Sequence, residues 1–305
     1  MQDILAEVLT AVEPYRGEGR PADYIPALAQ VDPRRFGIAF AGQDGVVHGA
    51  GECDEPFSIQ SISKVFTLAL ALQRVGRRLW DKVGREPSGS AFNSIVQLER
   101  ELGKPRNPLI NAGAIATTGQ LVGNRGADEA IGELLAFLRE QAADDRVAVD
   151  EAVARSEAQT GSRNRSLGWF MRNYNIVDND VETVLGVYFR QCAIAMSCRQ
   201  LARAGLFLAF DGRDPVTGRE VAAWHNARRI NSVMMLCGHY DNSGEFAYRI
   251  GLPGKSGVGG GILAIAPGHG AVAVWSPGLN SAGISLAGTE ALAQLVELTG
   301  WSLFA

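Results

Sequence analysis

The sequence has few of the residues that characterise disulfide-linked or metal-binding proteins. Its 305 residues include only four cysteines and four histidines. The cysteines form neither a CxxC pair nor a disulfide framework, and no two histidines have the HxxxH spacing that places two metal ligands on one helical face. We therefore expect free cysteines in the core, and neither a metal nor another cofactor. The cysteines are Cys53, Cys192, Cys198 and Cys237.

Long apolar runs and an excess of charge are also missing. The apolar run FTLALAL, at 66–72, ends at QRVGRR and is too short to span a bilayer. The net charge is −4 with a pI near 5.7, which disfavours a nucleic-acid or membrane-surface partner. The N-terminal segment carries acids early and lacks the pattern of a signal or transit peptide. A small-molecule partner and a cytoplasmic location are expected.

Hydrophobic periodicity predicts an α+β protein. Residues from about 58 to 230 have helical periodicity with Gly, Asn or Pro breaks, whereas β-type patterns occur near both ends of the chain. The other predicted elements are a helix at 2–13, a turn and short helix at 22–30, a hairpin at 34–52, strands at 245–251, 259–268 and 271–277, and a helix at 289–301. This order indicates a mainly antiparallel sheet from the N- and C-terminal segments, with flanking helices and an inserted helical subdomain.

We accordingly expect a single catalytic domain over 1–305. Its sheet subdomain would comprise 1–57 together with 231–305, and its mostly helical subdomain would comprise 58–230. Active sites often lie at such seams between parts of a fold.

A serine and a lysine stand three positions apart at the start of a predicted apolar helix, in FSIQSISKVF. On a helix beginning near Ser58, Ser61 and Lys64 would share a face. A serine hydroxyl becomes a good nucleophile when a nearby base takes its proton, and burial or a neighbouring cation can keep a lysine neutral for that role. Free N–H groups of a first helical turn could also hold an oxyanion. Both residue types are common on surfaces, so the SxxK pattern alone is a weak signal.

A glycine-rich segment, GLPGKSGVGGGI at 251–262, contains a second lysine, Lys255. A phosphate-binding GxxxxGK[ST] loop would need glycine where Arg249 stands, and a GxGxxG turn would need glycine where Ile262 stands. A flexible loop is one explanation. Our interpretation is a strand edge kept bare so that a substrate can approach its backbone.

An SxxK helix followed by a K-[ST]-G strand edge resembles the β-lactamase and penicillin-binding-protein superfamily. The SDN tripeptide of that superfamily is missing between the two motifs. Longer motifs resemble instead the serine-dependent glutaminases, L-glutamine amidohydrolases with a β-lactamase-like fold. They are DYIPALA at 23–29, FSIQSISKVF at 57–66, NPLINAGAI at 107–115, SEAQTGSRN at 156–164, VYFRQCA at 187–193 and CGHYDNSGEFAYRIGLPGKSGVGGGI at 237–262.

The resemblance implies a role for each matching residue. Ser61 would be the nucleophile that forms a glutamyl-enzyme and releases ammonia, with Lys64 as its general base. Tyr240 would pass a proton to the ammonia and later help to activate water. The N–H groups of Ser61 and Val258 would form the oxyanion hole.

The resemblance also implies how L-glutamine would bind as a zwitterion. Glu157 would bind its ammonium group, whereas Asn111, Asn164 and Tyr24 would bind its carboxylate. Tyr188 would line the pocket. Lys255 would keep Lys64 neutral or orient the loop, and His239 and Cys237 would be structural. Glu157 could instead be a solvated acid, Asn111 and Asn164 could be caps or turns, and Tyr24 and Tyr188 could be packed aromatics.

Two other functions are compatible with the motifs. One is a β-lactamase-like serine hydrolase acting on another amide or ester, which the missing SDN and the acid at 157 argue against. The other is a catalytically silent ligand sensor, which the presence of Ser61, Lys64 and Tyr240 argues against. The resemblance further implies a homo-oligomer, either a dimer or a tetramer.

Overall fold

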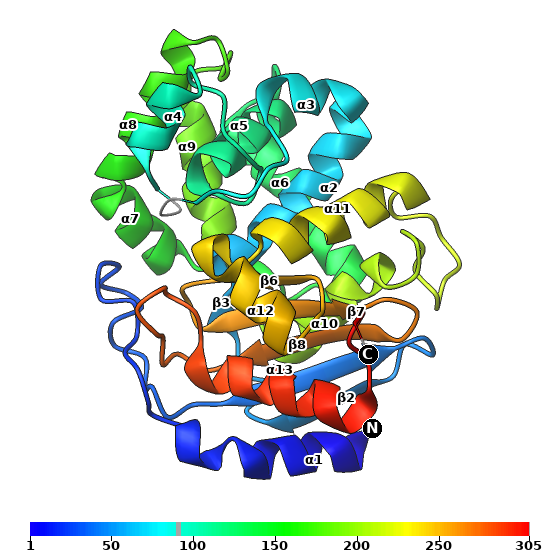
Figure 1. The fold of residues 1–305 in the computed structure, drawn as a ribbon. Coiled ribbons are helices and arrows are strands. Elements are labelled where there is room, and N and C mark those ends of the chain that lie inside the picture. Colours follow the sequence, from blue (N-terminus) through cyan, green and yellow to red (C-terminus); the bar gives the residue numbers. More distant parts are fainter. Residues whose placement is uncertain (90–92, 305) are drawn as a thin grey trace.

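A five-stranded antiparallel sheet forms one half of the molecule (Figure 1). The computed structural model describes residues 1–89 and 93–304. The strand order is β2-β1-β8-β7-β6, so both ends of the chain contribute, as the periodicity predicted. The strands are β1 (Gly37–Gly42), β2 (Val47–Gly51), β6 (Gly254–Ser256), β7 (Gly261–Ala266) and β8 (Gly270–Trp275).

Helices cover both faces of this sheet. Helices α1 (Gln2–Ala11) and α13 (Leu286–Thr299) lie on one face, and α10 (Cys198–Gly205) lies on the other (Figure 1). Alternate residues of β1 therefore join different cores: Ile38 and Phe40 pack with α1 and α13, whereas Ala39 and Ala41 pack with the helical half. Burial on both sides explains why β1, β7 and β8 are buried along their whole length.

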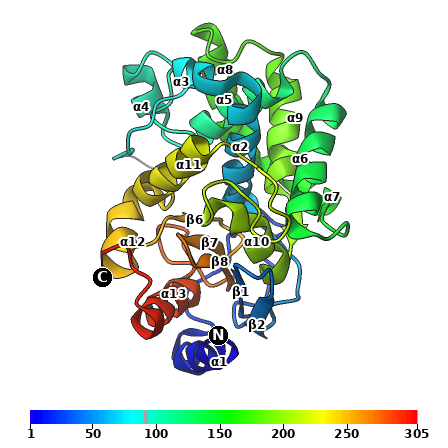
Figure 2. The same ribbon diagram turned by 90° about the vertical axis from the view of Figure 1, so that its right-hand side faces the viewer.

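The helical half is built around α2 (Ser63–Val75), which has other helices on every side in Figure 2. Its first ten residues are buried, so the apolar run FTLALAL is the core of a helical bundle. None of the helices in 1–89 and 93–304 combines the length and the apolar composition needed to cross a bilayer. The other helices are α3 (Leu79–Lys82), α4 (Ile95–Arg100), α5 (Asn111–Val122), α6 (Ala127–Ala142), α7 (Glu151–Thr160), α8 (Ser162–Asn173), α9 (Val181–Cys192), α11 (Trp224–Cys237) and α12 (Ser243–Arg249).

One predicted strand is wrong. The segment 245–251 lies mostly in α12, which ends at Arg249. Phe246 and Ile250, four positions apart, are buried, while Tyr248 between them is 89% exposed. A strand would place all three on one face, whereas a helix separates Tyr248 from the other two.

The sequence pattern also failed to predict several short elements correctly. Residues 22–30 form successive turns without the predicted helix. A second, three-stranded sheet lies within the predicted helical region, in the order β3-β5-β4. Its strands are β3 (Phe57–Ser58), β4 (Ala148–Val149) and β5 (Ile194–Met196). Strands of two or three residues are too short to show a period-2 pattern. The division into two subdomains stays a prediction.

Substitutions in α12 test its orientation. Phe246→Ala should lower the free energy of unfolding by about 3 kcal/mol, because it removes a buried aromatic side chain. Tyr248→Ala should change it by less than about 0.5 kcal/mol, because that side chain is exposed. Denaturant unfolding of both variants measures the difference. Equal losses would contradict the helical assignment.

Candidate active site

Ser61 lies in a tight 3-10 turn between strand β3 and helix α2. The turn spans Gln60–Ile62, so α2 begins at Ser63 rather than near Ser58 as predicted. Gln60 has φ 48°, a left-handed conformation that costs a non-glycine residue free energy. The hydroxyl of Ser63 donates to the Gln60 carbonyl at 2.7 Å and so fastens this turn. Ser61 is itself buried, with 8% of its surface exposed.

Lys64 is fully buried in the first turn of α2. Its amine donates to the Leu109 carbonyl at 3.1 Å and to Asn111 Oδ1 at 2.8 Å. Burial lowers the pKa of Lys64 from 10.5 to about 8, because the charged form loses its hydration. Burial is therefore the main cause that favours the neutral amine.

Tyr240 approaches Ser61 from the sheet side. It begins a 3-10 turn, Tyr240–Asn242, after α11, and its φ of 58° is also left-handed. Its phenol is hydrogen-bonded to the Ser61 hydroxyl, and burial raises the pKa of the phenol above its usual range. Tyr240 is therefore protonated at neutral pH and can donate a proton. The Lys64 Nζ lies 5.7 Å from the centre of its ring.

Lys255 on β6 lies on the same tyrosine. Its Nζ is 4.2 Å from the ring centre of Tyr240 and donates to the carbonyls of Gly238 and Ser256 at 2.7 and 2.6 Å. Burial lowers the pKa of Lys255, and Lys64 lowers it further. The side chain thus ties β6 to the turn that carries Tyr240. The neighbouring imidazole of His239 stacks on a phenylalanine ring, 3.6 Å between ring centres.

A cavity of about 100 Å³ brings the predicted residues together. Lys64 lies behind its wall, bonded to Asn111. The predicted residues that line it are Tyr24, Ser61, Asn111, Glu157, Asn164, Tyr188, Tyr240 and Val258. We call it the catalytic cavity. These eight lining residues come from the loop after α1, the turn before α2, four helices and the sheet side. The cavity therefore lies where the sheet meets the helices.

Glu157 of α7 is the one acid among these residues. It is 7% exposed, and burial raises its pKa from 4.5 to about 7. A hydrogen bond from Gln60 and the charge of Lys64 act in the opposite direction. A carboxylate this poorly hydrated would gain from a bound cation.

Two asparagines link the lysine to the cavity. Asn111 is the first residue of α5, and its Nδ2 donates to Asn164 Oδ1 at 3.0 Å. Its Oδ1 accepts from Lys64, so the Asn111 amide still has one N–H for a ligand. Asn164 lies on α8.

The two tyrosines occupy different depths. Tyr188 is 2% exposed, and the Lys64 Nζ lies 6.0 Å from its ring centre. Tyr24 is 52% exposed and therefore lies at the rim.

The glycine-rich segment has a different purpose from the predicted one. A Cβ on Gly257 would lie 2.5 Å from the Ile59 carbonyl oxygen, and one on Gly259 would lie 2.2 Å from that of Ser58. These glycines therefore admit the protein's own backbone rather than a substrate. The close contact holds Val258 beside the turn that carries Ser61.

Sequence reasoning missed Gln60. This residue is 2% exposed, lines the cavity, donates to Ser58 Oγ at 3.0 Å and is hydrogen-bonded to Glu157. It stands in the apolar run FSIQSISKVF directly before the candidate nucleophile. An amide in such a run is a signal that could have identified it.

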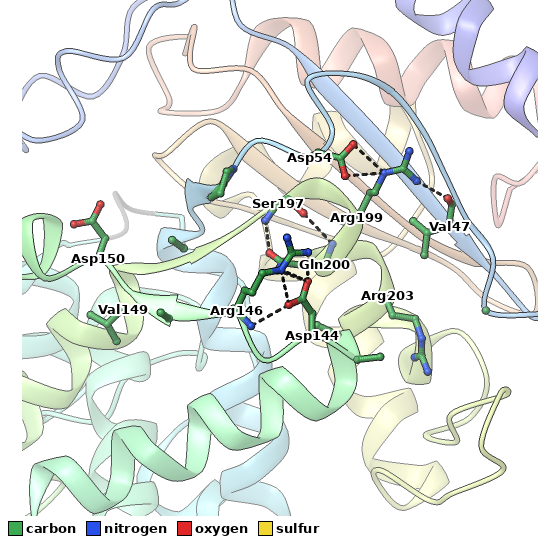
Figure 3. A pocket seen from close by; sticks show the side chains of 16 residues that line it. Val47, Asp54, Asp144, Arg146, Val149, Asp150, Ser197, Arg199, Gln200 and Arg203 are labelled. Carbon is green, nitrogen blue, oxygen red and sulfur yellow. Dashed lines mark hydrogen bonds and ion pairs between the residues drawn. The ribbon is translucent and has the colours of Figure 1, made fainter.

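A larger cavity, of about 670 Å³, contains none of the predicted residues. Figure 3 shows that several of its polar side chains bond to one another: Arg199 to Asp54, and Asp144 to both Arg146 and Gln200. The four cysteines are buried and free, as expected. Over 1–89 and 93–304, no group of three or more Cys, His, Asp or Glu side chains could hold a metal ion.

The fold and the cavity define a class of protein. The β-lactamase-like fold has three features that this structure shares. They are an antiparallel sheet built from both chain ends, a central helix with a Ser/Lys pair at its start and in the turn before it, and a lysine-bearing strand at the sheet edge.

Comparison with known proteins specifies the family. The Glutaminase family model matches residues 19–304, and the chain belongs to that family. A glutaminase of Rhizobium rhizogenes is 60% identical over 304 residues, which cover 100% of this chain and 98% of the relative. A thermolabile glutaminase of Rhizobium etli has the same identity and coverage.

Solved structures agree with this family. The probable glutaminase ybaS has a TM-score of 0.93 at 38% identity, covering 100% of this chain and 99% of that one. A probable glutaminase from Bacillus subtilis, complexed with 6-diazo-5-oxo-L-norleucine, has a TM-score of 0.90 at 32% identity, covering 99% and 97%. The β-lactamase-like α+β fold expected from the sequence is confirmed.

The tight packing of the glycine segment can be tested by substitution. Gly259→Ala should lower the free energy of unfolding by about 2 kcal/mol, because its Cβ would overlap the Ser58 carbonyl oxygen. Gly132→Ala in α6 is the matched control, since its Cβ meets nothing within 4 Å. That control should gain about 0.5–1 kcal/mol from better helix propensity. Changes of the same sign in denaturant unfolding would contradict the proposed contact.

Proposed function

We propose that the protein hydrolyses the side-chain amide of L-glutamine to L-glutamate and ammonia through a glutamyl-serine intermediate. The supporting observation is the convergence of three groups on one small cavity. Two of them line the cavity, a serine hydroxyl bonded to a protonated tyrosine and a buried acid, and the third, a buried lysine amine with a lowered pKa, lies directly behind its wall. Membership in the Glutaminase family supports the choice of substrate.

The first step is attack by Ser61 on the amide carbon. Neutral Lys64 takes the serine proton on its lone pair, because its two N–H groups donate to the Leu109 carbonyl and to Asn111 Oδ1. The N–H groups of Ser61 and Val258 hold the oxyanion. With a pKa near 8, Lys64 becomes a more available base as the pH rises from 7 to 9.

The second step releases ammonia. Tyr240 gives its proton to the leaving nitrogen as the C–N bond breaks, and Ser61 is left as a γ-glutamyl ester. Tyr240 then takes a proton from the water that attacks the ester. As the bond from carbon to Ser61 Oγ breaks, Lys64 returns to this oxygen the proton that it took in the first step, and glutamate is released. The raised pKa keeps Tyr240 protonated before the transfer, and it makes the resulting phenolate a strong base that readily takes a proton from water.

The remaining residues recognise the ends of glutamine. Glu157 binds the α-ammonium group. This positive charge favours the carboxylate form of Glu157, which burial disfavours. Asn111, Asn164 and Tyr24 donate to the α-carboxylate, and Tyr188 lines the pocket. The free N–H of Asn111 supports its part in this assignment.

We further propose that the protein is cytoplasmic and forms a homodimer or homotetramer. Four free, buried cysteines suit a reducing compartment. Large apolar side chains exposed on α11 and α12, among them Leu236 and Tyr248, suit a subunit contact.

Replacement of the nucleophile tests the reaction. Ser61→Ala should reduce ammonia release from glutamine by about a thousandfold or more, because no acyl-serine can form. Ammonia release and turnover of a chromogenic cephalosporin are measured on the same preparations. Turnover of the cephalosporin without turnover of glutamine would favour the alternative β-lactamase-like hydrolase. No turnover of either compound would favour a ligand sensor.

Glu157→Gln should weaken substrate binding and, at high pH, raise the free energy of unfolding. The loss of the ammonium's counter-charge should raise KM and lower kcat/KM. Because the folded-state pKa of Glu157 is raised from 4.5 to about 7, the stability of the native protein falls as the pH rises through this window. The free energy of unfolding of the variant should therefore exceed that of the native protein by about 3 kcal/mol at pH 8, and by little below pH 4.5. Unfolding at both pH values and steady-state kinetics check this; an unchanged kcat/KM would exclude the assignment.

A further inference from the structure

Gln191 of α9 is a buried amide that the proposed mechanism does not use. Its side chain is 0% exposed and reaches both α2 and α5. Its Oε1 lies 3.1 Å from the hydroxyls of Thr67 on α2 and Thr118 on α5, whereas its Nε2 has no partner in 1–89 or 93–304. A buried amide N–H without a partner destabilises a protein, so this arrangement needs an explanation.

The two threonines indicate which way the amide faces. Each hydroxyl has one hydrogen and also lies near a carbonyl of its own helix. Thr67 Oγ1 is 3.2 Å from the Ser63 oxygen, and Thr118 Oγ1 is 2.8 Å from that of Ala114. With the amide turned end for end, Nε2 donates one N–H to each threonine, and each hydroxyl donates to its own helix. Every N–H and O–H of the three side chains then has an acceptor, so the Gln191 amide is a donor to α2 and α5.

This amide joins the two helices that carry the proposed base and its hydrogen-bond acceptor. Thr67 is about one helical turn after Lys64 on α2, and Thr118 is about two turns after Asn111 on α5. Lys64 and Asn111 are themselves bonded at 2.8 Å. The two helices are thus connected twice, at the catalytic cavity by Lys64 and within the core by Gln191.

The next residue of α9 holds the turn of the nucleophile separately. The Ser58 hydroxyl donates to the Cys192 carbonyl at 3.0 Å. This bond fixes the chain just before Ser61 and does not involve the Gln191 side chain. Loss of the amide would therefore loosen the Lys64 side of this segment and leave the turn of the nucleophile attached.

We propose that Gln191 is a positioning residue for the general base: it holds α2 against α5, so that the Lys64 amine stays bonded to Asn111 and shielded from water. The proposal rests on the role of Lys64 proposed above. Because burial favours the neutral amine, water admitted between the two helices would favour the ammonium form. Gln191 does not line the catalytic cavity, so it acts through Lys64.

Five other ionisable groups face Lys64 from the neighbouring elements. They are Tyr188 and Cys192 on α9, Glu157 on α7, Tyr240 in the turn after α11 and Lys255 on β6. Burial raises the pKa of the thiol and of both phenols, which keeps these three groups neutral near pH 7. None of the five is substituted in the variants below, so a change in the pKa of Lys64 reports the hydration of its amine.

The pH dependence of kcat/KM for glutamine tests the proposal, because its rising limb reports the base of the free enzyme. In Gln191→Ala, a space flanked by two hydroxyls would admit water, and the limb should move up by about one pH unit. At pH 7, kcat/KM should then fall about tenfold, because the neutral fraction of Lys64 falls by that factor. At pH 10 the variant and the native enzyme should agree within about twofold.

Two further variants separate positioning from stability. Gln191→Met fills the space but cannot donate, so its limb should move by less, about half a pH unit, and it carries the test if the alanine variant does not fold. Gln141→Ala in α6 is the matched control, since Gln141 is 1% exposed and its Nε2 likewise has no partner within the described ranges. The control should lower the free energy of unfolding and leave the limb in place.

The possible failures are distinguishable. A limb that stays in place in both Gln191 variants, whatever their stability, would show that this residue only fills the core. An equal movement in the Gln141 control would also overturn the proposal, because the shift would then follow from lost stability. If the native enzyme releases ammonia but its profile has no rising limb between pH 7 and 9, the role of Lys64 fails together with this proposal. If glutamine gives no ammonia, the proposed function itself fails.

Discussion

The candidate site depends on one constraint, the burial of the Lys64 amine with no carboxylate bonded to it. Its partners are a carbonyl oxygen and the side chain of Asn111, which accept its hydrogen bonds without adding a full negative charge. A carboxylate in their place would favour the ammonium form. The apolar α2 and the packing of α5 against it exclude water and hold these acceptors in place. The same core thus stabilises the fold and favours a neutral base.

Strain and close backbone packing bring the reacting groups together. Gln60 and Tyr240 both have left-handed backbone conformations, one directly before the serine and the other at the phenol bonded to it. The glycine segment packs closely against the backbone carbonyls of Ser58 and Ile59. Strained conformations of this kind persist only where contacts with the surrounding structure hold them. Here those contacts come from both the sheet and the helices, which meet at this point.

The sequence predicted long elements better than short ones. The central helices, the N-terminal hairpin and strands β7 and β8 follow clear periodic patterns, whereas α12 contains too few residues to distinguish a helix from a strand by pattern. Among site residues, those within long motifs were predicted together and line one cavity. Gln60 was missed because its role depends on a contact with Glu157, nearly a hundred positions away in the chain. The purpose of the glycines was misjudged because their neighbour is another strand's backbone.

The sequence by itself determined the chemistry available to this protein: a serine and a lysine one helical turn apart, a tyrosine and a lysine far downstream, and no metal-ligand pattern. These depend on residue identity and local spacing. Only the tertiary structure decided which groups meet, how deeply each is buried and in which direction its pKa moves, because desolvation and hydrogen bonding depend on neighbours distant in the chain. The catalytic cavity belongs to the same category, since its walls come from segments more than 200 positions apart.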